Sequence, residues 1–489
     1  MAKTVSLKKE VPILYEVDVL VVGCGISGII AAVAAARGGA QTLAIDRFGQ
    51  LGGNIGPGHI GGAPSLELPP AMSGGIPGIA GEIIRECESL TGHPFLLNYF
   101  DDSQTFSNVA LRMFRREKVM TLLNVYLGDA IMEGNTVKGV FVETKAGTQA
   151  ILAKVVVDAT GDADVVFRSG APVNPGPDHY FHAGMYFSIG NVDIDTYREI
   201  GRAEVAEEFL QWRDDTGNPC NHHAYPLLPY MKKAHEKGDF EYVWERHYGR
   251  ICADHGIFYR SVGVTGPSVE DPRHLGKFGI VGGLVGLHFF EKSETSGNPT
   301  LMTELENDSR EYVYALQQFT KKYVPGFEKS YLHSTGIYFN ARGGRSMIAR
   351  HNITHEDLEK GSQFDDMVFR GFAGHQPADP LWELVHSYRY SFEIPYRQFL
   401  PQNVEGLLAA GRSCNDQSTR KDHPKRGAIL RMRWQMFMTG QAVGTAAAIS
   451  VNDGVPPSEV DIRKLRKALY TAEFYMADSK ERLSELGLA

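Results

Sequence analysis

Cysteine is scarce in this sequence of 489 residues, and the spacing of the few cysteines excludes several classes of protein. There are five, an odd number, and no two of them form a C-x-x-C pair. This pattern disfavours a disulfide framework, an iron–sulfur cluster and a dithiol redox pair. The histidines and carboxylates also lack the spacing of metal ligands, so we predict no metal site.

Segments that would direct the chain to a membrane or to nucleic acid are also missing. No apolar core follows the lysines of residues 1–10, as a signal peptide would require, and no apolar run is long enough to span a membrane. A formal net charge of −8 without a long basic face disfavours a nucleic-acid partner. We therefore expect a cytoplasmic protein with a small-molecule substrate, and self-association into a homo-oligomer stays open.

A glycine-rich turn between an apolar strand and an alanine-rich helix is the strongest motif present. The apolar residues 19–22 lead into Gly23, Gly25 and Gly28, and a second strand, residues 41–45, delivers Asp46. In a dinucleotide-binding turn the first glycine allows a tight turn, the second admits a pyrophosphate and the third lets the helix pack closely. A carboxylate about 20 residues further on accepts hydrogen bonds from a ribose. The combination predicts a nucleotide site rather than a structural glycine turn.

A second glycine-rich loop follows the acidic residue directly. It contains Gly52, Gly53 and Asn54 and continues to residue 62, with His59 in its middle. Because only glycine lets a backbone approach a ligand this closely, we predict that the loop lines the cofactor. A flexible surface loop is the alternative.

The remaining pattern predicts the fold class. Strands at residues 155–158 and 404–409 end in small-residue turns and return to the first sheet, while strands at 120–123, 136–144 and 149–153 form a small antiparallel layer. We predict an α/β protein with a doubly wound, Rossmann-like domain built from discontinuous segments and an inserted α+β substrate domain. The predicted limits are 1–170 for the first part, 171–330 for the insert, and 331–489 for the return from the insert and the last part.

Together these motifs resemble the FAD-dependent oxidoreductase family of the glutathione-reductase-like flavoproteins, over residues 18–53, 155–164 and 331–449. The resemblance implies FAD as cofactor, with the turn at 158–164 as a second contact, Gly411 and Arg412 near the flavin, and a helix from Gly440 that faces it. Many members carry cysteines for iron–sulfur clusters, which this chain lacks. The predicted cofactor contacts are Gly23, Gly25, Ile26, Ser27, Gly28, Asp46, Arg47, Gly52, Gly53, Asn54, Ala159, Thr160, Gly161, Asp164, Gly411, Arg412, Arg431, Gly440 and Ala442.

Only one dinucleotide fingerprint is present, whereas a flavoprotein with its own nicotinamide domain normally shows two. We therefore expect a dehydrogenase or oxidase that takes a hydride from a small organic substrate and passes electrons to oxygen, a quinone or another acceptor. The alternatives are a flavin-dependent monooxygenase that binds NAD(P)H transiently and a non-catalytic electron-transfer flavoprotein subunit.

Oxidation of a hydroxyl or an amine needs a base, and imidazole and phenol side chains can move protons. The candidate catalytic residues are His59, His333, Tyr338 and His375. Arg342 and Arg345, together with a charged run at 418–426, are compatible with an anionic ligand, although ion pairs with neighbouring carboxylates explain the two arginines equally well.

Overall fold

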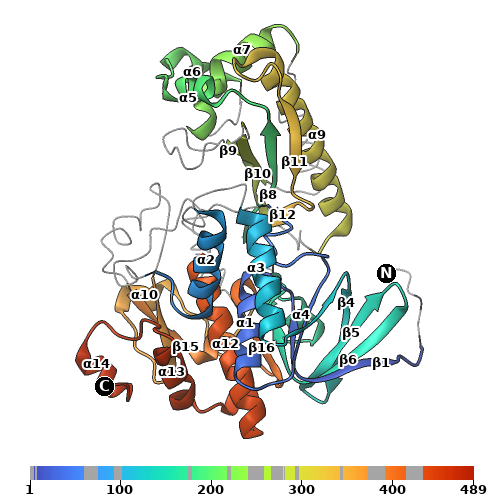
Figure 1. Ribbon diagram of the computed structural model, residues 1–489, viewed down its shortest axis with the longest axis vertical. Coiled ribbons are helices and arrows are strands. Elements are labelled where there is room, and N and C mark those ends of the chain that lie inside the picture. The colour runs from blue at the N-terminus through green and yellow to red at the C-terminus, as the bar shows by residue number, and fades with distance from the viewer. Residues whose placement is uncertain are drawn as a thin grey trace.

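The computed structural model describes the chain in two stacked parts, a large α/β part and a smaller insert (Figure 1). The structure describes residues 5, 8–59, 75–92, 102–174, 179–216, 222–239, 258–265, 279, 281–291, 297–341, 345–372, 391–414 and 433–489. His375, Arg431 and Arg342 lie outside these residues.

A seven-stranded sheet forms the centre of the large part, in the order β3-β2-β1-β6-β5-β4, with β16 also paired to β6. Strands β1, β2, β3, β6 and β16 are parallel where they pair. For β1 and β2 the helix that connects them allows this direction. The sequence pattern therefore correctly predicts a doubly wound α/β domain whose strands come from distant segments. The strands are β1 (Ile13–Val22), β2 (Thr42–Asp46), β3 (Met120–Leu123), β4 (Tyr126–Glu133), β5 (Thr136–Thr144), β6 (Gly147–Asp158) and β16 (Leu407–Ala409).

Strand β6 joins two layers that the sequence pattern separates. One edge of β6 pairs antiparallel with β5 over its first half and parallel with β16 over its last three residues. The predicted strands at 149–153 and 155–158 are thus one strand, and β4 was not predicted. The prediction that residues 120–123 belong to the antiparallel layer is wrong, because β3 pairs in parallel with β2.

Helices cover this sheet, and two of them cross at a stripe of small residues. A Cβ atom at Gly440 would lie 2.3 Å from the Ser27 carbonyl oxygen, and one at Gly444 would lie 2.2 Å from that of Ala31. These small residues let α12 pack against α1, and Ala442 is fully buried. The contact of this helix with the cofactor stays a prediction. The helices are α1 (Ile26–Arg37), α2 (Gly78–Thr91), α3 (Asp102–Arg116), α4 (Asp164–Arg168) and α12 (Arg433–Asp453).

The insert has its own sheet and its own hydrophobic core. Its five strands are antiparallel, in the order β11-β8-β10-β9 with β12 also on β8. Met185, Phe187 and Ile189 of β8 pack into a core with helices α7 and α9. The elements are β8 (His179–Gly190), α5 (Ile194–Arg202), α6 (Glu207–Asp215), α7 (Leu228–Glu236), β9 (Phe258–Thr265), β10 (Val281–Glu291), α9 (Pro299–Tyr323), β11 (Tyr331–Thr335) and β12 (Asn340–Ala341).

Short elements complete the large part beside the main sheet. Two two-stranded sheets pair β13 with β7 and β14 with β15, and Thr354 caps the helix α10 by accepting the N–H of Asp357. These elements are β7 (Val173–Asn174), β13 (Ser346–Met347), α10 (His355–Lys360), β14 (Met367–Phe372), β15 (Ser391–Pro395), α13 (Ile462–Thr471) and α14 (Lys480–Glu485).

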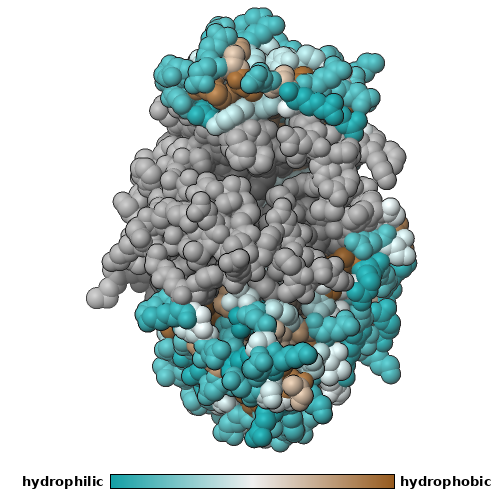
Figure 2. All heavy atoms as spheres, turned by 90° about the vertical axis from the view of Figure 1, so that its left-hand side faces the viewer, coloured by the Kyte–Doolittle hydropathy of each residue, from teal (hydrophilic) through white to brown (hydrophobic). Residues whose placement is uncertain are grey.

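None of the described helices combines the length and the apolar character that crossing a membrane needs. In the view of Figure 2, the described surfaces of both parts are mainly hydrophilic.

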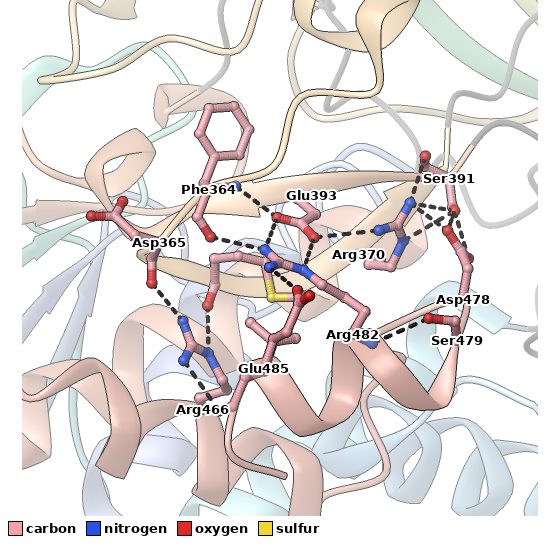
Figure 3. A network of polar contacts seen from close by, with 12 residues as sticks. Phe364, Asp365, Arg370, Ser391, Glu393, Arg466, Asp478, Ser479, Arg482 and Glu485 are labelled. Carbon is pink, nitrogen blue, oxygen red and sulfur yellow. Dashed lines mark hydrogen bonds and ion pairs between the residues drawn. The ribbon is translucent and has the colours of Figure 1, made fainter. Parts of the chain in front are cut away.

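A buried ionic network fastens the C-terminal helices to β15 (Figure 3). The carboxylate of Glu393, whose residue is only 1% exposed, accepts hydrogen bonds from Arg482 at 2.8 and 2.9 Å and lies 3.5 Å from Arg370. Arg466 of α13 donates to the carbonyl oxygens of Met367, Asp365 and Leu486. Because each charged side chain of the network has a hydrogen-bond or ion-pair partner, the network holds α13 and α14 against β14 and β15.

We predict that Glu393→Ala lowers the free energy of unfolding by about 3–5 kcal/mol, because it leaves two arginines without their buried acceptor. Urea denaturation of the full chain measures this change. Glu356→Ala is the matched control, since Glu356 pairs with Lys360 on the exposed face of α10, and it should change stability little. Equal effects of the two substitutions would contradict the importance of the buried network.

Candidate active site

The three glycines of the first turn are fixed by close backbone contacts. Gly23 has a positive φ of 98°, and a Cβ atom there would lie 2.5 Å from the Ala159 carbonyl oxygen. A Cβ atom at Gly28 would lie 1.8 Å from the carbonyl oxygen of Gly23. No larger residue fits either position, so β1, α1 and the end of β6 meet only because these residues are glycine.

Gly25 differs from its neighbours because its Cα faces open space. A Cβ atom at this position would meet nothing within 4 Å. Gly25 precedes α1, whose N-terminus has no capping side chain and no acidic residue in its first turn. An uncapped helix N-terminus beside an open backbone suits a bound phosphate group.

The second glycine loop lies against the first. Gly52 donates its N–H to the Cys24 carbonyl oxygen at 2.8 Å, and a Cβ atom at Gly53 would lie 2.9 Å from Gly25 Cα. The two loops therefore form one glycine-lined cradle, which we define as Gly23, Gly25, Gly28, Gly52 and Gly53.

Asp46 lies at the carboxyl end of β2, as the motif predicts. Its carboxylate accepts hydrogen bonds from the N–H groups of Cys24 at 2.6 Å and Phe48 at 2.9 Å. Burial raises the pKa of Asp46, and these two backbone donors oppose that rise. The carboxylate thus shapes the glycine turn itself, and its contact with a ribose stays a prediction.

The second predicted contact segment is organised by a buried carboxylate. Asp158 accepts hydrogen bonds from the hydroxyls of Thr160 and Ser413 and from the N–H groups of Val165 and Val166. Ser413 in turn accepts from the N–H groups of Gly161 and Ala163. The sequence reasoning missed Ser413, which joins the turn after β6 to the turn after β16.

The arginines predicted near the cofactor are ion-paired. Arg412 donates to the Gly161 carbonyl oxygen at 2.6 Å and to Asp162 at 2.9 Å, and Arg345 pairs with Asp164 at 2.6 Å. Of the two alternatives for Arg345, the ion pair is the one the structure shows. Desolvation and the charges of Asp162 and Asp158 raise the pKa of Asp164 to about 6.

Some residues that were predicted to contact the cofactor make contacts with other parts of the protein. The Ser27 hydroxyl donates to the Met436 carbonyl oxygen at 2.8 Å, and a Cβ atom at Gly411 would lie 2.3 Å from Ser27 Oγ. Ser27 and Gly440 therefore let α1 pack against α12, and Gly411 lets the turn after β16 pack against α1.

Tyr338 reaches the cradle from the loop between β11 and β12. Its hydroxyl donates to Asn54 Oδ1 at 2.6 Å, its ring stacks on Phe48 at 4.6 Å between centroids, and the Arg47 guanidinium lies over both rings. Burial raises the pKa of Tyr338 well above its usual value, so its phenol keeps its proton. This position favours a structural link to the cofactor loop over a role as base.

His59 and His333 come together from opposite sides. The loop that carries His59 follows Gly52 and Gly53 through successive turn hydrogen bonds, and the His59 ring stacks on Tyr186 of β8 with 6.4 Å between centroids. His333 lies on β11, where Nδ1 is 3.0 Å from Ser188 Oγ. Desolvation, and then the charge of His333, lower the pKa of His59. Tyr186 and Ser188 escaped the sequence analysis because nothing marks strand residues of the insert as site residues.

Among the described residues, no group of three histidine, cysteine, aspartate or glutamate side chains could hold a metal ion. The described part of the site is therefore a glycine cradle with two flanking carboxylate–arginine pairs and two histidines on its insert side.

Comparison with protein families identifies this architecture. The family model described as FAD dependent oxidoreductase matches residues 18–469, so the chain belongs to that family and is an FAD-dependent oxidoreductase enzyme. No curated relative matches the chain. Solved structures with some similarity at 12% identity include a geranylgeranyl bacteriochlorophyll reductase-like protein from Thermoplasma acidophilum (96% of each chain, TM-score 0.37), the flavin-dependent brominase Bmp2 (94% and 83%, 0.39) and p-nitrophenol 4-monooxygenase from Pseudomonas putida (97% and 93%, 0.38).

The residues of the cradle fit FAD. The open backbone at Gly25 and the uncapped start of α1 offer a place for the pyrophosphate, and Asp46 lies at the adjacent strand end. The cofactor is FAD, and its contact with these particular residues stays a prediction.

We predict that Gly25→Ala weakens FAD binding at least about tenfold without lowering the melting temperature of the apoprotein, because the added methyl group enters only the space meant for the pyrophosphate. Quenching of flavin fluorescence on titration measures the affinity. Gly28→Ala should instead lower both affinity and stability, since its methyl group collides with the backbone of Gly23. Unchanged FAD affinity in Gly25→Ala would place the pyrophosphate elsewhere.

Proposed function

We propose that the protein is a dehydrogenase or oxidase that removes a hydride from a small organic substrate and passes the electrons to oxygen, a quinone or another acceptor. The observation that supports this proposal is the position of His59, which is tied to the glycine cradle on one side and contacts the insert sheet on the other. A substrate that reacts with FAD has to bind between these two parts. FAD, when bound, supplies the redox chemistry by accepting the hydride.

The contacts of His59 suit a general base. Gly58 and His59 donate their N–H groups to the carbonyl oxygens of Gly53 and Gly56 at 2.9 and 3.0 Å. His59 has a positive φ of 56°, a conformation that costs energy for a residue with a side chain and that is commonest at functional sites. Its lowered pKa leaves the imidazole unprotonated near neutral pH, ready to accept the proton of a substrate hydroxyl or amine.

Residues of the insert contact the His59 loop from the side opposite the cradle. Gly336 donates its N–H to the Tyr186 carbonyl oxygen at 2.9 Å, and Ile337 donates to the Pro57 carbonyl oxygen at 3.2 Å. The loop between β11 and β12 therefore contacts β8 and the His59 loop at once. Arg345 and Arg412 are each paired with a carboxylate, so neither offers an unshared charge to an anionic substrate.

The first test is anaerobic titration of the FAD-loaded protein with hydroxy acids, sugars and amines. Loss of the visible flavin absorbance with one class identifies that class as substrate and supports the proposal. Rapid NAD(P)H oxidation that depends on an aromatic substrate would support a monooxygenase instead.

We predict that His59→Gln retains FAD but lowers turnover about 10²- to 10⁴-fold, the usual contribution of a general base. The wild-type rate should fall as the pH drops through the lowered pKa of His59, because a protonated imidazole cannot accept a proton. His235→Gln is the control, since His235 is exposed on α7 and contacts Trp212. Normal turnover in His59→Gln would exclude His59 as the base.

A further inference from the structure

Strand β8 presents two different faces. Met185, Phe187 and Ile189 point into the core of the insert, so Tyr186 and Ser188 lie on the opposite face. Residues two apart on one face of a strand are separated by about 6.6 Å. Because the His59 ring lies over Tyr186, a group held at Ser188 is its immediate neighbour.

A bulge in β11 places His333 at that position. The pairing of β11 with β8 shifts between Leu332 and Ser334, so His333 is the extra residue. In a regular strand His333 and Ser334 would point to opposite faces. Here both reach the hydroxyl of Ser188, with His333 Nδ1 at 3.0 Å and Ser334 Oγ at 2.7 Å. A bulge next to a site commonly re-aims a side chain in this way.

Among the described residues around His59, the ionisable groups to consider near neutral pH are two phenols, one ion pair and His333. Tyr186 of β8 and Tyr338 of the β11–β12 loop are phenols, neutral in this range. On α9, Arg310 and Glu306 hold that loop and neutralise each other as a pair at 2.7 Å. His333 is the remaining group, and its charge acts directly on His59.

We propose that His333 is a positioning residue for the reaction: the bulge and the hydroxyl of Ser188 hold its imidazole on the His59 side of β8, where a positive charge on His333 acts on the base. This inference rests on the proposed role of His59. The half-buried His59 loses hydration when it is charged, whereas His333 is exposed, and a positive charge on His333 opposes a second positive charge on His59. Ser188, which is 1% exposed, holds the His333 ring in place by accepting from or donating to Nδ1.

The test combines His333→Gln, which removes the charge, with His333→Lys, which keeps a positive charge over the whole range. The direct readout is an NMR titration of the His59 ring in the FAD-loaded full chain with labelled histidine. In His333→Gln the midpoint of His59 should move to higher pH, and the ratio of turnover at pH 5.5 to that at pH 8 should fall about two- to threefold. His333→Lys should restore the wild-type midpoint and ratio.

Two further variants separate position from charge. Ser188→Ala frees the His333 ring and should move the His59 midpoint in the same direction as His333→Gln, whereas His235→Gln should leave it in place. An unchanged His59 midpoint in His333→Gln would overturn the inference. A shifted midpoint together with normal turnover in His59→Gln would instead overturn the proposed function and leave the coupling intact.

Discussion

The contact between backbones at Gly23 and Gly28 is the constraint on which the rest of this structure depends. There β1, α1 and the end of β6 come closer than any side chain would allow. The same closeness recurs where α12 crosses α1 at Gly440 and Gly444. The cofactor cradle therefore depends on glycine at Gly23 and Gly28, where backbone leaves no room for a side chain. Only beside Gly25 does the cradle leave open space.

Local patterns were sufficient to predict the nucleotide-binding unit of the large part. An apolar strand, a glycine turn and an acid at the next strand end describe a unit whose geometry is set within 30 residues, and β1, α1 and β2 follow it closely. The returns of β6 and β16 were also predictable, since buried parallel strands appear as apolar runs. The partner of β3 was not, because strand pairing is decided by neighbours far away in the sequence.

The candidate site could likewise be predicted from the sequence only in part. The cradle glycines and Asp46 occupy the positions that the motif predicts, although contact with FAD at each residue stays a prediction. The partners of Arg345 and Arg412 required the fold, because an arginine in a sequence does not reveal which carboxylate lies beside it. The setting of His333 depends on a bulge, and one extra residue in a strand leaves no mark on the sequence pattern.

Helix α12, which packs against α1, is synthesised long after α1. Helix α1 buries Ile29, Ile30 and Val33, but the helix that crosses it begins only at Arg433, after the insert sheet has been completed at Ala341. At the usual speed of a ribosome, the roughly 400 residues between Arg37 and Arg433 take about 20–80 s to synthesise. Throughout that time the apolar face of α1 lacks its native cover, and exposed apolar surface of this kind promotes aggregation of a nascent chain.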